Sequence, residues 1–240
     1  MLRTTRAIVL RQFKYGETSL IVELYTEQLG VRKYIISGVR SPKSRTKANL
    51  LQVMSMVEVV AYEREDRDLN RLKEVRPAYV FQGIPFDVRK GAVGLFMIEV
   101  VRKAIRERES NRGLFAFLWE RFAGLDRTPH PVGQYHLCFL LELTTFLGFA
   151  PAGHFTPSTP FFDLREGEFL SQPPGHNEYL TEDLAARLEQ LLTIAAPDSH
   201  SVKLGREERR QLLKGILDFY YLHLEGMAAV QAHLILQEIF

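Results

Sequence analysis

The chain has 240 residues, of which 46% are hydrophobic, enough for a packed core in one large domain or two modest ones. No run approaches the roughly 20 uninterrupted apolar residues of a membrane span. The first residues turn polar before a signal-peptide core could form, so we expect a cytoplasmic protein. A single cysteine, Cys138, excludes a disulfide within the chain and a cysteine-rich zinc site.

The charge is spread unevenly, although the net charge is only +2. Residues 1–50 contain ten lysines or arginines against three acids, whereas the rest of the chain is net negative. We therefore expect a polyanion to approach the N-terminal part of the protein.

Short β-type runs separated by glycine and charged turns extend from Thr4 to about Pro77. Gly16 and Gly30 stand between successive runs, where a positive φ suits glycine. Five such runs predict a closed five-stranded OB-fold barrel over residues 1–80. They read TRAIVLRQF, TSLIVELYT, GVRKYIISG, QVMSMVEVVAY and LNRLKEV.

A helical period replaces the strand pattern after Pro77, and it predicts an all-helical domain over residues 81–240. The domain boundary is expected near residues 77–84, without a long flexible linker. The tail from Arg206 predicts one or two helices with a break at Gly226. Earlier helices are expected after Pro85, from Gly113 to Gly124, from Val132 to Gly148 and from Thr181 to Ala195.

A segment rich in proline and glycine, residues 149–180, interrupts the helical pattern. Within it, FFDLREGEFLS predicts a small irregular hairpin that turns at Glu166 and Gly167.

Motifs for catalysis are missing from the sequence, which has no GxxxxGK[ST], GxGxxG, HExxH or GxSxG. The seven histidines are scattered without ligand spacing, so we predict no catalytic residue, no cofactor and no metal site. Asp163, Glu166 and Glu168 could form a magnesium site, but a solvated hairpin tip is the favoured interpretation.

The strongest functional signal is the segment from Gly38 to Lys47. Its glycine and proline keep the backbone out of a helix, so basic side chains can follow a sugar-phosphate strand. Tyr15, Tyr25 and Tyr34 could stack on bases or belong to the barrel core, and the sequence does not decide between these roles. The predicted DNA-binding residues are Arg40, Lys43, Arg45 and Lys47 in this segment, with Arg32 and Lys33 in the strand before it.

A second candidate surface is a helical groove that would receive an acidic, aromatic peptide from a partner protein. Most of the apolar residues in the two richest helices must be core, so only some can line such a groove. The residues predicted to line it are Arg121, Arg127, Tyr135, Phe139, Lys203 and Arg206.

The N-terminal run RAIVLRQFKYGETSLIVELYTEQLGVRKYIISGVRSPKSR resembles the signature of the bacterial RecO family. In that signature a YGE turn, a strand ending in Thr, a turn glycine, and GVR before a basic loop follow in this order. The similarity is greatest over residues 1–60, and PFD at Pro85 to Asp87 and LLELTTFLGFAP at Leu140 to Pro151 continue it.

The resemblance implies an OB-fold before a helical domain, binding of single- and double-stranded DNA, annealing of complementary strands and loading of the RecA recombinase. It also implies RecR, RecF and the acidic C-terminal tail of the single-strand-binding protein as partners, and a nucleoid-associated place in the cytoplasm. Many relatives carry a four-cysteine zinc knob after the GFAP-like segment. Residues 149–180 hold no cysteine, so packing of Phe155, Phe161, Phe162 and Phe169 or the predicted hairpin must replace that knob.

Two other functions remain open at this point. The same barrel could serve an RNA-binding accessory factor, because nothing in the sequence excludes RNA. A metal-dependent nuclease built on Asp163, Glu166 and Glu168 is the less favoured alternative.

Overall fold

The computed structural model describes residues 1–41, 48–64, 67–105 and 109–240, and Lys43, Arg45 and Lys47 lie outside these ranges. The described chain divides into two compact units. The first contains Met1–Phe86 and Ile98–Asp126, and the second contains Asp87–Met97 and Arg127–Phe240.

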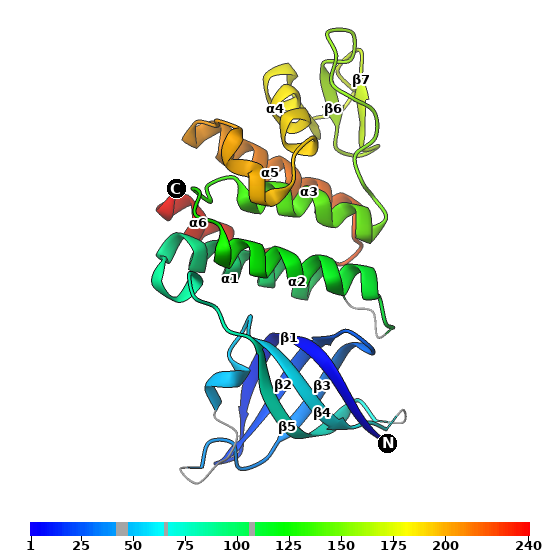
Figure 1. Ribbon diagram of the computed structural model, residues 1–240. Helices are drawn as coiled ribbons and strands as arrows, with labels where there is room; N and C mark the ends of the chain where they lie inside the picture. The colour runs from blue at the N-terminus through cyan, green and yellow to red at the C-terminus, as the bar shows by residue number, and fades with distance from the viewer. Residues whose placement is uncertain (42–47, 65–66, 106–108) are drawn as a thin grey trace. The chain divides into compact units, whose positions relative to one another are not determined.

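Five strands close into a barrel in the order β1-β2-β3-β5-β4, drawn in blue to cyan in Figure 1. All neighbours are antiparallel except β3 and β5, which run parallel and close the barrel. The predicted five-stranded barrel is therefore confirmed. The strands are β1 (Leu2–Tyr15), β2 (Ser19–Thr26), β3 (Gly30–Ile36), β4 (Met56–Tyr62) and β5 (Leu69–Tyr79).

Alternation of side chains explains the barrel core. Val22 and Leu24 of β2 and Tyr34 and Ile36 of β3 point inward and are buried with apolar residues of the other strands. Gly16, in the turn between β1 and β2, has a φ of +59°, a conformation that side-chain-bearing residues rarely adopt.

Helix α2 (Arg112–Arg127) packs on the outer wall of the barrel where β1 and β2 run. Arg6 of β1 donates two hydrogen bonds to Glu27, at 3.0 and 2.7 Å, and its guanidinium lies 5.1 Å from the ring centre of Trp119. The ring of Tyr25 lies 6.0 Å from that of Phe115. One side of the barrel is therefore covered within its own unit.

Asp126, at the end of α2, binds the chain that leaves β5. Its buried carboxylate, only 4% exposed, accepts hydrogen bonds from the backbone N–H groups of Gln82, Gly83 and Ile84 and from the hydroxyl of Tyr79, at 2.7 to 3.1 Å. Burial alone would raise the pKa of Asp126, but these four donors together lower it below its ordinary value. The charged form is thus the one that the fold stabilises.

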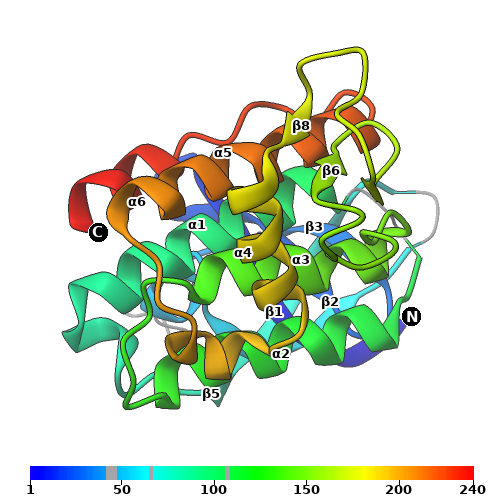
Figure 2. The same ribbon diagram turned by 90° about the horizontal axis from the view of Figure 1, so that it is seen from above.

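The second unit is mainly helical, as the sequence predicted, and α1 is shared between the units. Figure 2 shows α6 beside α5, and the Tyr220 hydroxyl of α5 donates a 2.6 Å hydrogen bond to the Leu140 carbonyl of α3.

No helix in the described part of the chain is both long and apolar enough to cross a bilayer. The remaining helices are α1 (Val88–Ala104), α3 (Tyr135–Leu147), α4 (Glu182–Leu192), α5 (Arg206–His223) and α6 (His233–Ile239), with 3-10 turns η1 (Ala48–Leu51), η2 (Ile84–Phe86) and η3 (Ala196–Ser201).

The predicted hairpin is confirmed by β6 (Phe161–Asp163) and β7 (Glu168–Leu170), and Gly167 in its turn has a φ of +74°. A short strand that the sequence did not indicate, β8 (Tyr179–Leu180), completes a sheet of order β7-β6-β8.

Aromatic packing holds this small sheet against α5. The Phe162 ring lies 4.9 Å from Phe169 and 5.8 Å from Phe219, measured between ring centres. A Cβ added at Gly167 would lie 3.2 Å from Phe219, so only glycine fits this close approach comfortably. Phe162 and Phe169 are thus two of the four phenylalanines expected to pack in this segment, and both are buried.

Replacing Asp126 with asparagine should destabilise the protein by about 2–4 kcal/mol, because a buried charged acceptor is lost and an amide N–H₂ group then faces backbone donors. Urea unfolding measures this cost. Asp218→Asn is the control, since Asp218 pairs with Lys214 on the surface and its loss should cost less than about 0.5 kcal/mol. Equal costs for the two variants would contradict the role given to Asp126.

The stability difference between the wild type and Asp126→Asn should depend on pH. The folded-state pKa of Asp126 lies below the ordinary value, so its contribution is present above about pH 4 and is lost as the pH falls through the folded-state pKa. Unfolding measured from pH 7 to pH 3 should show the gap between the two proteins narrowing on the acid side.

Candidate nucleic-acid interface

Arg40 is the one basic residue of the predicted DNA-binding segment, residues 38–47, that the structure describes. Lys43, Arg45 and Lys47 fall outside the described residues. The backbone N–H of Arg40 donates to the Thr18 carbonyl at 3.0 Å, and its exposed guanidinium lies 3.5 Å from the Gly16 carbonyl. The structure therefore places Arg40 against the turn between β1 and β2.

Other cations and aromatic rings surround this turn. The guanidinium of Arg11 lies 4.1 Å from the ring centre of Phe13, and the exposed Lys14 lines a hollow of about 350 Å³ together with Phe13 and Arg40. Tyr15 is 55% exposed. Aromatic rings beside cations are what a protein needs to stack bases and neutralise phosphates of a single strand.

Arg32 and Lys33 line a different hollow, of about 420 Å³, on the β3 side of the barrel. Six arginines or lysines and three acids line it, so its lining has a net positive charge. The basic members are Arg3, Arg32, Lys33, Arg64, Arg67 and Arg102.

A further hollow of about 960 Å³ follows β5 and shares Arg64 and Arg67 with the previous one, so we name the two together the β3–β5 cleft. Arg64, Arg67, Arg71 and Lys73 line this second part, and its described lining contains no aspartate or glutamate. Exposed apolar side chains of Tyr62 and Leu69 lie among these cations. The cleft can therefore offer both phosphate contacts and apolar surface to bases.

Buried Asn70 binds the backbone of Arg64 and Arg67. Its Oδ1 accepts from the Arg64 N–H at 3.1 Å, and its Nδ2 donates to Glu63 Oε2 at 3.3 Å. The Tyr34 hydroxyl donates to the other oxygen of Glu63 at 2.5 Å. Glu63, the acid adjacent to Arg64, is therefore bound by neutral donors rather than by an arginine.

Arg64, Arg67 and Arg71 form no ion pair with any residue that the structure describes, whereas Arg76 of β5 binds Glu74 at 3.1 Å. Unpaired cations on an exposed wall attract a polyanion, because their charge is not neutralised locally. These three arginines were not among the predicted DNA-binding residues, and the exposed alternation of Leu69, Arg71 and Lys73 was the signal that could have revealed them.

The burial of Tyr15, Tyr25 and Tyr34 decides whether each could stack on a base or belongs to the core. Tyr34 is buried in the barrel core and Tyr25 is buried under α2, so neither is available to a base. Tyr15 alone of the three is exposed.

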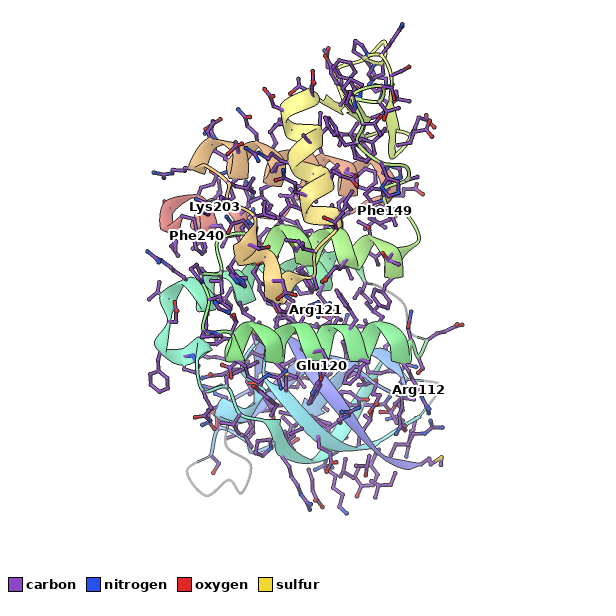
Figure 3. The ribbon with its side chains drawn as sticks, turned by 45° about the horizontal axis from the view of Figure 1, so that its top comes forward. Arg112, Glu120, Arg121, Phe149, Lys203 and Phe240 are labelled. Carbon is purple, nitrogen blue, oxygen red and sulfur yellow. The ribbon has the colours of Figure 1, made fainter. Side chains whose placement is uncertain are left out.

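The residues predicted to line the peptide groove have different surroundings in the structure. Tyr135 and Phe139 are buried in the helical core, so they do not line an open groove. Arg206 lines one hollow and Lys203 lines another, and the two hollows meet at Phe240, which belongs to the lining of both. Figure 3 labels Lys203 and Phe240 in this region. Arg121 belongs to α2 and lies 5.2 Å from the Phe117 ring centre, and Arg127 is absent from the lining of both hollows.

The acids considered for a magnesium site are not arranged as one. Buried Asp163 accepts hydrogen bonds from the N–H groups of Arg165 and Glu166 in the hairpin turn, and His176 lies 3.2 Å from its other oxygen. Glu166 and Glu168 are exposed. No group of three or more potential ligands that could hold a metal ion occurs among the described residues.

A closed five-stranded barrel with unpaired cations along an open cleft is characteristic of OB-fold proteins that bind nucleic acid. Residues 1–81 match the family model described as Recombination protein O N terminal, and residues 85–229 match Recombination protein O C terminal. The chain therefore belongs to the RecO family of DNA repair proteins.

Relatives named DNA repair protein RecO align along their whole length with the whole of this chain. The protein of Bacteroides fragilis is 36% identical over 241 residues, that of Christiangramia forsetii 35% over 244, and that of Phocaeicola vulgatus 33% over 240. In each case the alignment covers 100% of both chains.

Replacing Arg64, Arg67 and Arg71 together with alanine should weaken binding of a labelled oligothymidylate and flatten its salt dependence, by about 0.7 in the log–log slope per lost phosphate contact. Fluorescence anisotropy over a salt series measures both quantities. Arg76→Ala is the matched control on β5, because its partner Glu74 already neutralises it. A single Arg71→Ala variant that behaves like Arg76→Ala would contradict the cleft assignment.

Proposed function

We propose that the protein is a cytoplasmic, nucleoid-associated recombination mediator without catalytic activity. It binds single- and double-stranded DNA, anneals complementary strands and helps to load a RecA-type recombinase onto DNA covered by single-strand-binding protein. The observation that supports this most is the group of unpaired arginines in the β3–β5 cleft, in a chain that belongs to a DNA repair family.

Annealing by such a surface requires no bond to be made or broken by the protein. Two complementary strands repel each other through their phosphates, and basic side chains reduce that repulsion when both strands are held close together. The bases then pair through their own hydrogen bonds. Arg40 with Lys14 at the β1–β2 turn and the arginines of the β3–β5 cleft provide separate basic areas for this purpose.

Partners follow from the family and belong to the same proposal. RecR, RecA, RecF and the acidic tail of the single-strand-binding protein are the expected ones. The two hollows that meet at Phe240 suit an acidic peptide with an aromatic residue, because their lining includes Arg89, Lys203, Arg206 and Arg210 beside apolar side chains.

Annealing of complementary oligonucleotides without ATP tests the proposal, with wild type compared with the Arg40→Ala/Lys43→Ala/Arg45→Ala variant at several salt concentrations. We expect wild-type annealing to decline with salt, because it depends on phosphate neutralisation, and the variant to be at least roughly tenfold slower. Fluorescence transfer between labelled strands gives the rate.

The control variant in this assay is Lys214→Ala, whose side chain pairs with Asp218 on a surface helix. A folded wild type that fails to anneal would overturn the mediator function. Faster annealing of RNA than of DNA of the same sequence would instead support an RNA-binding accessory role, and strand cleavage in magnesium would support a nuclease.

A further inference from the structure

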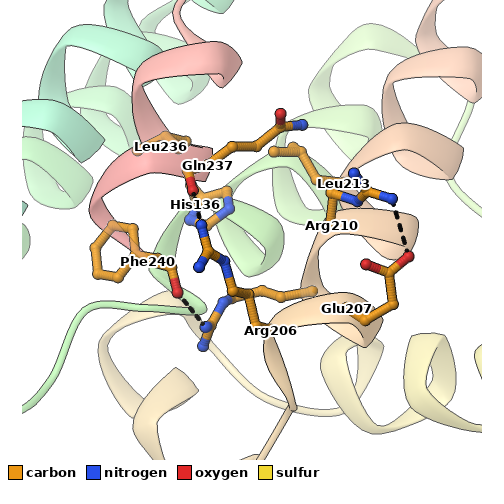
Figure 4. Close-up of a pocket in the computed structure, with 9 residues that line it drawn as sticks. His136, Arg206, Glu207, Arg210, Leu213, Leu236, Gln237 and Phe240 are labelled. Atoms are coloured by element: carbon orange, nitrogen blue, oxygen red, sulfur yellow. Dashed lines mark hydrogen bonds and ion pairs between the residues drawn. The ribbon is translucent and has the colours of Figure 1, made fainter.

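The last turn of α6 occupies the place where the two basic hollows of the helical unit meet. Figure 4 labels Arg206 of α5 together with Gln237 and Phe240 of this turn. Arg206 donates to the Gln237 carbonyl at 2.8 Å, and Arg209 donates to the Phe240 oxygen at 3.0 Å. The Arg209 guanidinium also lies 5.9 Å from the centre of the Phe240 ring.

The ring of Phe240 is held by the walls of both hollows. It lies 6.4 Å from the ring of buried His136, measured between centres and nearly parallel to it. A Cβ added at Gly133 would lie 3.2 Å from Arg209 Nη1 and 3.7 Å from Phe240, so glycine leaves room for this contact. Phe240 therefore fills a space between His136, Gly133 and Arg209 that fits an aromatic side chain, and we call this space the seat.

The arginines of this seat have no aspartate or glutamate partner among the described residues. Glu207, the acid in the lining, is bound to Arg210 at 3.2 Å. Burial, followed by the charge of Arg206, lowers the pKa of Arg209. Burial and the charge of Arg209 also lower the pKa of His136 to about 3, so His136 is neutral at physiological pH and adds no charge. Among the described residues, Arg206 meets only the neutral Gln237 carbonyl, so it has unused affinity for an anion.

The tail is weakly attached to the rest of its unit. α6 has seven residues, too few for a stable helix on its own, and a segment without helix separates it from α5. Leu236 is its one buried side chain, whereas Leu234 is 56% exposed and Ile235 is exposed as well. Displacing α6 therefore uncovers little additional apolar surface.

We propose that residues Gln237–Phe240 act as an internal competitor that occupies the partner-peptide seat and must leave before an acidic, aromatic peptide binds. This proposal rests on the peptide-binding role proposed above and adds its regulation. The incoming aromatic ring takes the place of Phe240 between His136 and Arg209. Its carboxylates take the place of the Gln237 carbonyl on Arg206 and of the Phe240 oxygen on Arg209.

The exchange is favourable at Arg206, because a carboxylate forms stronger, charge-assisted hydrogen bonds with its guanidinium than the Gln237 carbonyl does. Arg89 and Lys203, which line the neighbouring hollow, give further acidic residues of the peptide a place to bind. A closed seat reduces the apparent affinity in proportion to the fraction of molecules in which the tail is bound.

Binding of a fluorescein-labelled peptide, Asp-Asp-Asp-Glu-Ile-Phe, tests the competition. It keeps the Glu-Ile-Phe sequence of residues 238–240 and adds three aspartates. We expect Phe240→Ala to bind it about fivefold or more tightly than wild type, because the variant's own tail no longer fills the seat. Leu234→Ala is the matched control in α6, and its affinity should equal that of wild type.

Arg209→Ala separates two effects, release of the tail from the seat and loss of a side chain that binds the peptide. This variant also loosens the tail, but it should bind the peptide at least tenfold more weakly than wild type, since the guanidinium serves the incoming carboxylate. Thermal unfolding confirms that each variant is folded.

A tryptophan reporter detects the displacement directly. Trp119 is the single tryptophan of the chain, so a Trp119→Phe/Phe240→Trp protein carries its only indole in the seat. Peptide binding should shift its emission to the red, as the indole leaves the seat for water.

The outcomes separate the two proposals. Arg209-dependent peptide binding that Phe240→Ala weakens or leaves unchanged, with no red shift, would overturn the competitor role and keep the peptide site. If no folded variant binds the peptide, both the peptide site and its regulation fail, while the DNA-annealing function remains open to its own test.

Discussion

The barrel unit depends on one buried carboxylate, that of Asp126. Its four donors come from the end of β5 and from the residues just after it, so a single charged group joins the last strand of the barrel to the end of α2. Burying a carboxylate is costly unless it is fully hydrogen-bonded, and these donors meet that requirement. Helix α2 is thereby held on the β1 and β2 wall, where Arg6 and Tyr25 contact its aromatic side chains.

Where cations stand, more than how many there are, determines what the barrel can bind. Arg6 and Arg76 are paired with Glu27 and Glu74, so their charge is neutralised within the fold. Arg64, Arg67 and Arg71 have no such partner among the residues that the structure describes, and the nearby Glu63 is bound by Tyr34 and Asn70. A modest net charge of +2 is therefore compatible with a strongly basic surface.

The sequence predicted the elements well because their patterns are local. Alternation marked the five strands, a helical period marked the helices, and glycine marked the turns at Gly16 and Gly167. Arg32 and Lys33 were predicted, but the arginines of β5 and of the residues before it escaped prediction, because parallel pairing brings Lys33 beside Leu69, residues far apart in sequence. Tyr25 was ambiguous for a similar reason: it points out of the barrel, and it is buried where Phe115 of α2 packs against it.

The small sheet and the α6 tail show how apolar contacts can be either permanent or exchangeable in the same helical unit. Phe162 and Phe169 are buried with Phe219 in an aromatic cluster, so removing either ring would leave a cavity. Phe240 instead shares a hollow with Arg206, which can form a stronger bond with a carboxylate than with the Gln237 carbonyl it now holds. An aromatic contact next to an unpaired cation is therefore one that an acidic ligand can replace, whereas an aromatic contact inside an apolar cluster is not.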